Sequence, residues 1–211
     1  MWVPFSRYLF NSLFVSVVAT GGNVLIASMA AYPLAKFQLR VKWIFNFVVV
    51  ALLFNTTILW LPQYVILAKT GMLDTYLVYI LPQLATPLGL FLMKQFMERV
   101  IPDSLLEAAR IDGASQWKIF WRIVMPNVKS AWLTLMLLSV QNLWAVGANR
   151  FIYKEELKTL PYALGQILSG GIARAGVGAA VTVLMMLVPI AIFVFSQSNI
   201  IDTMASSGMK D

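Results

Sequence analysis

The sequence predicts an all-α membrane protein, a bundle of transmembrane helices, from its composition and from five long apolar segments. Of its 211 residues, 60% are hydrophobic and 12% are charged, and the mean hydropathy is +0.77. Soluble domains average roughly 45–50% apolar and about 25% charged residues. A helix needs about 20 apolar residues to cross a bilayer, and the five segments approach or exceed this length. We therefore expect one polytopic domain over residues 1–211.

None of the five apolar segments contains Asp, Glu, Lys or Arg. They cover residues 8–35, 43–68, 75–93, 130–148 and 177–195. Pro82 and Pro87 lie inside the third, where neighbouring helices can satisfy the freed carbonyls. Proton-coupled transporters usually need ionisable groups inside their spans, so the pattern argues against a proton symporter. A short helix is expected near 160–168, and a polar tail follows the last segment.

Small residues in the first segment predict how it packs. Gly21 and Gly22 interrupt it and allow either a kink or a close helix contact. Ala27, Ala31 and Ala35 recur every fourth residue, the small-residue spacing that lets membrane helices approach closely. We interpret this alanine stripe as a packing face.

The composition excludes several kinds of chemistry. The chain has no cysteine and no histidine, which excludes disulfides, His–Cys zinc sites and histidine acid–base catalysis. It has no G-x-x-x-x-G-K-[ST] sequence and so no P-loop to hold ATP phosphates. The net charge of +7 fits basic loops beside membrane spans better than nucleic-acid binding. We expect no catalytic residue, no cofactor and no metal site.

The stretch 101–126, IPDSLLEAARIDGASQWKIFWRIVMP, is amphipathic and rich in charge. Ser104 and Glu107 have the spacing of a capping box, which predicts a helix start, with Asp103 as an alternative N-cap. Gly113 suits the left-handed residue that ends such a helix. A second helix is expected from near Ser115, and Pro126 is expected to end or kink it.

Several fixed positions in this stretch carry a resemblance. Glu107-Ala108-Ala109, Gly113, Ile123 and Pro126 have the spacing of the EAA motif of ABC importer membrane subunits, with Met125 where the motif has leucine. The segment EAARIDGAS resembles the corresponding segment of the carbohydrate-uptake branch of this family, and is similar to that of the membrane subunits of maltose-type importers. Without the resemblance, the stretch reads equally well as an ordinary amphipathic loop between two spans.

The resemblance implies a permease subunit of an ATP-driven importer for a sugar or oligosaccharide, without enzymatic activity of its own. It implies ABC ATPase subunits, a second permease subunit that is homologous or identical, an extracytoplasmic sugar-binding protein and the lipid bilayer as partners. Residues 101–126 would be the cytoplasmic loop that couples to the ATPase. The coupling residues would be Glu107, Ala108, Ala109, Arg110, Asp112 and Gly113.

Basic residues predict the orientation in a bacterial or archaeal plasma membrane. Most Lys and Arg residues lie in the 36–42 loop, the 94–129 region and the tail, and the positive-inside rule places these in the cytoplasm. Related carbohydrate permeases usually have six spans, so we expect that the family's first helix is missing, through a fragment, a late start or a short form. The tail at 206–211 is either a disordered end or a segment that reaches the ATPase dimer.

Polar and aromatic side chains within the spans are candidates for the substrate path, because amides, hydroxyls and aromatic faces are what sugars bind. They are Asn55, Thr56, Thr57, Gln141, Asn142 and Trp144. The alternative, which we favour, is that they hydrogen-bond between helices. Two other functions stay open: an ABC permease for a peptide, amino acid or ion, and a membrane scaffold or channel that docks a soluble partner.

Overall fold

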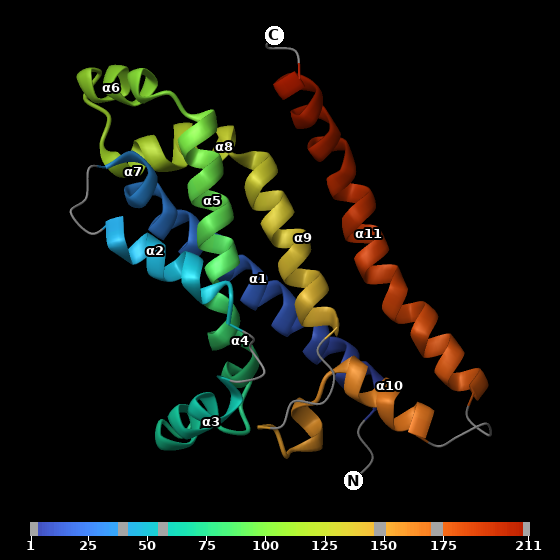
Figure 1. Ribbon diagram of the computed structural model, residues 1–211. Coiled ribbons are helices and arrows are strands. Elements are labelled where there is room, and N and C mark those ends of the chain that lie inside the picture. The colour runs from blue at the N-terminus through green and yellow to red at the C-terminus, as the bar shows by residue number, and fades with distance from the viewer. Residues whose placement is uncertain (1–3, 38–41, 55–58, 146–150, 170–174, 209–211) are drawn as a thin grey trace.

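The computed structural model describes residues 4–37, 42–54, 59–145, 151–169 and 175–208. Within these ranges the chain is helical and has no strand, which confirms the all-α class (Figure 1). The elements are α1 (Phe5–Lys36), α2 (Lys42–Ala51), α3 (Trp60–Lys69), α4 (Leu77–Leu84), α5 (Pro87–Val100), α6 (Asp103–Ile111), α7 (Gln116–Ile119), the π-helix η2 (Phe120–Val124), α8 (Met125–Asn127), α9 (Lys129–Ala145), the 3-10 helix η3 (Glu155–Leu157), α10 (Leu160–Ser169) and α11 (Ala175–Gly208).

The bundle has two distinct ends (Figure 1). One end carries α6, α7, α8 and the C-terminal end of α11. The other carries the N-terminus, α3 and α10. The helices α5 and α9 connect the two ends, and α1 packs against both.

The first predicted span is confirmed as one uninterrupted helix, α1. Gly21 and Gly22 do not break it; instead Gly22 faces the side chain of Leu84, which would collide with any β-carbon built there. Ala27 and Ala31 are buried in the main core. Small side chains on this face let neighbouring helices come close, so the predicted packing role of the stripe agrees with the structure.

The prediction of one continuous helix over 43–68 is wrong. The structure has two ten-residue helices, α2 and α3, each about 15 Å long and so too short for a hydrocarbon core of about 30 Å. The end of α2 tightens through i→i−3 bonds at Leu53 and Phe54. Pro62 lies in the first turn of α3, where a missing amide costs nothing. This proline therefore fits the start of a new helix better than the continuation of an old one.

The third predicted span is broken and longer than expected. It consists of α4 and α5, which together form a 24-residue candidate span from Leu77 to Val100, well past the predicted end at Met93. The break lies at Ala85, because Thr86 caps α5 and accepts a hydrogen bond from the amide of Gly89 at 3.2 Å. Pro87 is then the first helical residue, a position that proline favours.

The last span was expected over residues 177–195, followed by a polar tail, but the helix does not end there and includes residues 196–208. Helix α11 continues through them to Gly208. Between Pro189 and Gly208 the sequence has no proline or glycine, and extending an existing helix avoids the cost of nucleation. The short helix expected near 160–168 is confirmed as α10.

In the described residues, three helices are long and apolar enough to cross a membrane: Phe5–Lys36, Leu77–Val100 and Gly176–Val194. A fourth results if Gln116–Asn127 and Lys129–Trp144, which meet at a 75° bend, form one span. The structure thus gives three or four spans by length and composition, against the five predicted.

Candidate functional site

The helix α6 is held at its start by a lysine from the end of α1. The Lys36 ammonium donates to the carbonyl of Ile101 at 2.6 Å and to the Asp103 carboxylate at 2.8 Å, and its side chain is 5% exposed. The helix begins at Asp103 with Pro102 as N-cap and no side-chain cap bond. The predicted Ser104–Glu107 capping box is therefore wrong, since the tertiary contact from Lys36 fixes this end instead.

The two faces of α6 differ sharply. Leu106 and Ala109 are buried in the main core, whereas Ala108 is exposed. The two alanines of the motif therefore have different surroundings: one packs inward and the other lies on the surface. Ile111 is 86% exposed, which is unusual for a side chain that is most often buried.

The charged side chains around α6 form an open groove. It has a volume of about 410 Å³ and is lined in part by Lys36, Glu98, Asp103, Glu107 and Arg110. Among the described residues, Glu107 has no ion pair, while Asp103 and Glu98 pair with lysines. The structure thus leaves one carboxylate of the groove available.

Gly113 makes the turn that was predicted for it. Its φ is +75°, in the left-handed region where a β-carbon is unfavourable. The Ala114 amide donates to the Ala109 carbonyl and the Gly113 amide to the Arg110 carbonyl, both at 3.0 Å. This pair of bonds is the Schellman motif. It satisfies the last carbonyls of α6 and sets the angle at which the chain leaves it.

The second helix of the loop starts where the sequence predicts. The Ser115 hydroxyl accepts a hydrogen bond from the Lys118 amide at 3.3 Å. Tyr32 of α1 donates its hydroxyl proton to the Gln116 side-chain oxygen at 3.0 Å. Both ends of the loop are thus tied to α1, through Lys36 on one side of Gly113 and Tyr32 on the other.

This second helix ends at Asn127, one residue after Pro126. It passes through the π-helix η2, and the chain then bends by 75° into α9. Side chains replace the backbone donors that the bend removes: Asn127 donates to the Ile123 carbonyl at 2.7 Å, and Trp132 donates to the Met125 carbonyl at 3.2 Å. The predicted effect of Pro126 is therefore confirmed, with the bend itself at Val128.

A buried amide joins three helices at the break between α4 and α5. Pro87 has no amide proton to give to the Gln83 carbonyl, and the Asn23 side chain of α1 donates to that carbonyl at 2.6 Å. The Asn23 amide group also bonds Thr86 at 2.9 Å, and Ser139 of α9 donates to the Asn23 oxygen at 3.2 Å. Asn23 is 0% exposed. The sequence reasoning missed this role, although an asparagine inside an apolar span is itself a signal.

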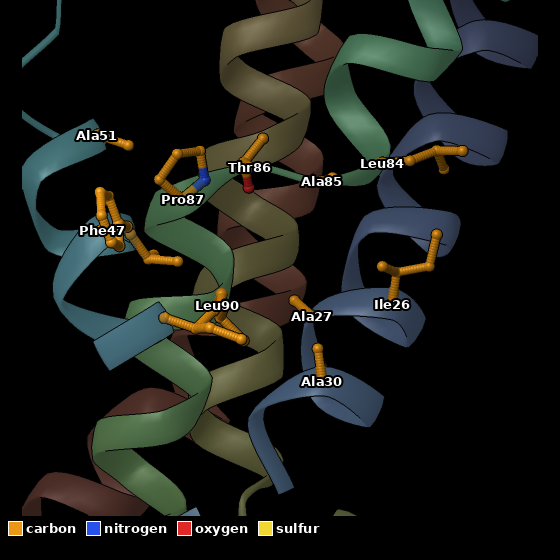
Figure 2. Close-up of a pocket in the computed structure, with 12 residues that line it drawn as sticks. Ile26, Ala27, Ala30, Phe47, Ala51, Leu84, Ala85, Thr86, Pro87 and Leu90 are labelled. Atoms are coloured by element: carbon orange, nitrogen blue, oxygen red, sulfur yellow. The ribbon is translucent and has the colours of Figure 1, made fainter. Parts of the chain in front are cut away.

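An apolar cavity opens beside this break. It has a volume of about 400 Å³, and Figure 2 shows its lining side chains arriving from α1, α2 and the α4–α5 junction. Thr86 and Pro87 form part of the wall, together with Phe47 of α2 and Ala27 and Ala30 of α1. The break therefore has polar contacts on one side and loosely filled apolar space on the other.

Comparison with known proteins identifies the family. The sequence model of the binding-protein-dependent transport system inner membrane component matches residues 22–206. This chain belongs to that family. The matched residues include α6 and Asn23 with its hydrogen-bonding partners, so both features lie in the region that the family model covers.

Curated relatives agree with the assignment. This chain is 32% identical over 180 residues to the sn-glycerol-3-phosphate transport system permease protein UgpE of Yersinia enterocolitica. The alignment covers 85% of this chain and 60% of the relative. The chain is 34% identical to Protein LplC of Bacillus subtilis over 66% of this chain and 47% of the relative. It is 29% identical to the melibiose/raffinose/stachyose import permease protein MelC of Bacillus subtilis over 95% of this chain and 76% of the relative.

Solved structures confirm the fold of this inner membrane component. One is a bacterial ABC transporter involved in the import of the acidic polysaccharide alginate, with a TM-score of 0.81 and 23% identity over 92% of this chain and 74% of that one. Another is a bacterial alginate ABC transporter in complex with an alginate pentasaccharide-bound periplasmic protein, with a TM-score of 0.56 and 17% identity over 91% of this chain and 76% of that one.

The predicted substrate-path residues do not come together as one group in the described residues. Asn55, Thr56 and Thr57 lie outside those residues. Gln141 and Asn142 are exposed on α9. Trp144 is 4% exposed and donates to the Met185 carbonyl of α11 at 2.8 Å. This contact is the interhelical bond given as the alternative, and it leaves Gln141 and Asn142 as the accessible candidates.

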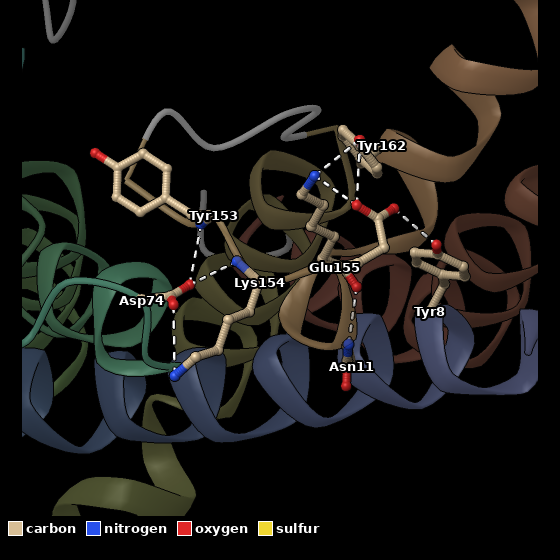
Figure 3. Close-up of polar contacts among 8 residues, drawn as sticks. Tyr8, Asn11, Asp74, Tyr153, Lys154, Glu155 and Tyr162 are labelled. Atoms are coloured by element: carbon tan, nitrogen blue, oxygen red, sulfur yellow. Dashed lines mark hydrogen bonds and ion pairs between the residues drawn. The ribbon is translucent and has the colours of Figure 1, made fainter. Parts of the chain in front are cut away.

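At the opposite end from α6, the 151–158 segment is tied down by carboxylates (Figure 3). Asp74 accepts hydrogen bonds from the backbone amides of Tyr153 at 3.0 Å and Lys154 at 2.8 Å, and lies 3.5 Å from the Lys154 ammonium. Glu155 accepts from Tyr8 at 2.8 Å and pairs with Lys158 at 2.6 Å. No group of three or more potential metal-ligating residues occurs in the described part of the chain.

These contacts make the 151–158 segment sensitive to acid. Burial by itself would raise the pKa of Asp74, but hydrogen bonds from the amides of Lys154 and Tyr153 and the Lys154 charge outweigh it and lower the pKa below its ordinary 3.8. A lowered pKa in the folded state means that the contribution to stability is complete above about pH 4 and is lost as the pH falls through the folded pKa.

We expect Asp74→Asn to lower the melting temperature at neutral pH and to have little effect at the most acidic pH that the protein tolerates. Asparagine keeps a hydrogen-bond acceptor and tolerates the φ of +60° at this position. The difference in melting temperature between the two proteins therefore reports the loss of the negative charge. Thermal melting of both proteins across the acidic range is the measurement. A melting difference that stays constant as the pH falls through the folded pKa would show that the Asp74 charge plays no part.

Proposed function

We propose that this chain is a membrane subunit of an ATP-driven importer and forms part of the translocation path without catalysing a reaction itself. The chain spans 60% and 47% of the first two curated relatives described above, so the activity of the whole protein is an inference. The observation that carries it is the geometry of α6: a helix anchored on its inner face, ended by the Gly113 turn, and exposing Glu107 and Ile111. Because the sequence has no P-loop, ATP hydrolysis belongs to partner subunits.

The exposed face of α6 supports docking of an ATPase subunit from the cytoplasm. Ile111 offers an apolar contact, and Glu107 offers a carboxylate without an ion pair in the described residues. The same end of the bundle carries the basic loops that the positive-inside rule places in the cytoplasm. Ala108 leaves little side-chain volume on this face, so a partner can approach the helix closely. Ala109 packs into the core, and the backbone carbonyls of Ala109 and Arg110 accept the hydrogen bonds of the Gly113 turn. Arg110 and Asp112 are exposed beside Glu107 and are proposed to contact the ATPase with it.

Transport would follow from movement of α6. The contacts of Lys36 and Tyr32 connect the loop to α1, and the helix after Gly113 leads through the 75° bend into α9. Closure of the ATPase dimer would therefore displace two spans at once. In this mechanism ATP and the loaded binding protein bias a two-state equilibrium between inward-open and outward-open forms. A second permease subunit completes the path.

We propose a sugar or oligosaccharide as the substrate class. Relatives named for melibiose, raffinose and stachyose and for arabinooligosaccharides align over 95% or more of this chain. A phosphorylated polyol is the second candidate, because the 32% identical relative is named for sn-glycerol-3-phosphate. Gln141 and Asn142 are the polar side chains that we assign to the path, and uptake of labelled compounds from both classes separates the two candidates.

Removing the Glu107 carboxylate is expected to weaken ATPase binding. In the docked complex Glu107 would be buried against a basic residue of the ATPase, and truncating one member of such a pair costs about 2–5 kcal/mol. Glu107→Ala should therefore lower the ATPase recovered with this chain in mild detergent by roughly thirtyfold or more. Glu156→Ala is the matched control, since it removes an exposed carboxylate at the other end of the bundle. Equal recovery with wild type, Glu107→Ala and Glu156→Ala would refute the proposed contact.

A further inference from the structure

The helix that follows Gly113 carries an exposed stripe of two tryptophans and two basic residues. We call Trp117, Lys118, Trp121 and Arg122 the aromatic–basic stripe. Trp117 is 59% exposed and Trp121 46% exposed, and their rings stack with centroids 6.4 Å apart and planes 10° apart. Lys118 and Arg122 are also exposed. Such large aromatic exposure needs a partner, because burial of these rings contributes strongly to binding.

The opposite face of the same helix is buried in the core, and this determines which way the stripe faces. Ile119, Phe120 and Val124 are at most 3% exposed and belong to the main core. The Phe120 ring lies 5.6 Å from that of Tyr32 on α1. The helix therefore cannot turn to bury its tryptophans without losing its core contacts.

The bend at Val128 determines how the helix that carries the stripe is oriented relative to the membrane. The segment Gln116–Asn127 makes an angle of 75° with Lys129–Trp144. If the latter crosses the bilayer, the former lies close to the membrane plane. Figure 1 shows α6 beyond α7 at this end of the bundle, so the helix that carries the stripe lies closer than α6 to the candidate spans. Tryptophan is enriched at the headgroup level of membranes, which fits a helix in this position and orientation.

The charge of the segment selects the kind of lipid. From Ala114 to Lys129 the sequence has three basic residues and no acidic one. Among the described residues, neither Lys118 nor Arg122 forms an ion pair. Basic side chains at a membrane surface attract anionic phospholipids, and an interfacial helix with aromatic and basic residues binds them through both contributions.

We propose that the aromatic–basic stripe binds anionic phospholipid headgroups at the α6 end of the bundle. The tryptophans set the depth of the helix and the two bases contact the lipid phosphates. Since Gly113 joins this helix rigidly to α6, the bound lipids would also hold the docking helix at a fixed height above the membrane. The inference uses membrane insertion of the chain and is independent of which substrate it transports.

The natural absence of cysteine gives a direct test. A single fluorophore is attached at Ser115→Cys, with Asn127→Cys as a second position, because both residues are exposed beside the stripe and leave its tryptophans and bases in place. The full chain is reconstituted in nanodiscs of phosphatidylcholine and phosphatidylglycerol in equal parts. The quencher is a headgroup nitroxide carried either by phosphatidylglycerol or by phosphatidylcholine. Ile111→Cys is the control position, because Ile111 is exposed on α6, beyond the headgroup region.

We expect the labels at 115 and 127 to be quenched by headgroup nitroxides and the label at 111 not to be. Quenching by the anionic quencher should exceed quenching by the zwitterionic one, and removing each base should reduce that preference by up to about fivefold. Lys118→Gln and Arg122→Gln make these changes, with Lys69→Gln as the charge-matched control at the other end of the bundle.

Two results would overturn the proposal. Labels at 115 and 127 as weakly quenched as the label at 111 would place the helix in water. Equal quenching by the two lipids, unchanged in Lys118→Gln and Arg122→Gln, would remove the anionic preference. If the labels were shielded only after ATPase subunits are added, the stripe would be a protein interface, which also contradicts lipid binding.

Discussion

Replacing Gly113 by aspartate is expected to separate ATP hydrolysis from substrate uptake. Gly113 adopts a φ of +75°, and an added β-carbon would meet no atom within 4 Å, so the effect comes from the backbone and from the new charge and not from a clash. A non-glycine residue in the left-handed region costs roughly 1–2 kcal/mol, which is about five- to thirtyfold in an equilibrium constant. The strain falls on the Schellman turn that joins α6 to the helix before α9.

The measurement is uptake by the reconstituted transporter alongside its ATPase rate. We expect uptake to fall by about tenfold while hydrolysis continues without stimulation by the binding protein. Gly113→Asn is the matched control, because asparagine has the shape of aspartate and a similar tolerance of left-handed geometry but lacks its charge. It should retain more uptake than Gly113→Asp. Normal uptake by Gly113→Asp would refute the coupling role of the turn.

Asn23→Ala should destabilise the protein by removing the hydrogen bonds that join three helices. It leaves the Gln83 carbonyl without the donor that bonds it at 2.6 Å, next to Pro87, which has no amide proton to replace it. A buried polar group left unsatisfied costs about 1–3 kcal/mol, which lowers the melting temperature by roughly 2–4 °C per kcal/mol in a chain of this size. Thermal melting in detergent measures this loss.

Two matched variants show where the Asn23 effect originates. Ser139→Ala removes only the 3.2 Å bond to the Asn23 oxygen and should cost less. Thr134→Ala removes a hydroxyl bonded within its own helix and should be nearly neutral. Hydrogen exchange of the amides around Ala85 should accelerate in Asn23→Ala alone. A melting temperature equal to wild type in that variant would show that the break between α4 and α5 does not depend on the amide.

The break between α4 and α5 and the cavity of about 400 Å³ beside it lie at the start of α5, while α6 and its Gly113 turn follow the end of α5. α5 leads directly into α6 through Pro102, while Asn23 holds the start of α5 to α1 and α9. A displacement of α6 therefore acts on a helix that is fixed by hydrogen bonds at its other end. The regular helix is interrupted at Ala85, between α4 and α5.

The sequence alone is enough to predict the features that depend on local chemistry. The length and apolar character of α1, the apolar character of α11, the left-handed turn at Gly113 and the Ser115 cap each follow from a few neighbouring residues. The EAA spacing likewise indicates the family from local sequence, because all its fixed positions lie within twenty residues of one another.

The tertiary structure decides what depends on distant partners. Asn23 and the carbonyl freed by Pro87 are 60 residues apart in sequence, and no local pattern shows that they meet. The start of α6 depends on Lys36, 67 residues before Asp103, which is why the local capping-box signal at Ser104 is misleading. A side chain's burial, as for Ala109 against Ala108, is likewise set by which helices pack against it. Local sequence therefore predicts where hydrogen-bonding groups lose their neighbours, and only the fold determines which residue replaces them.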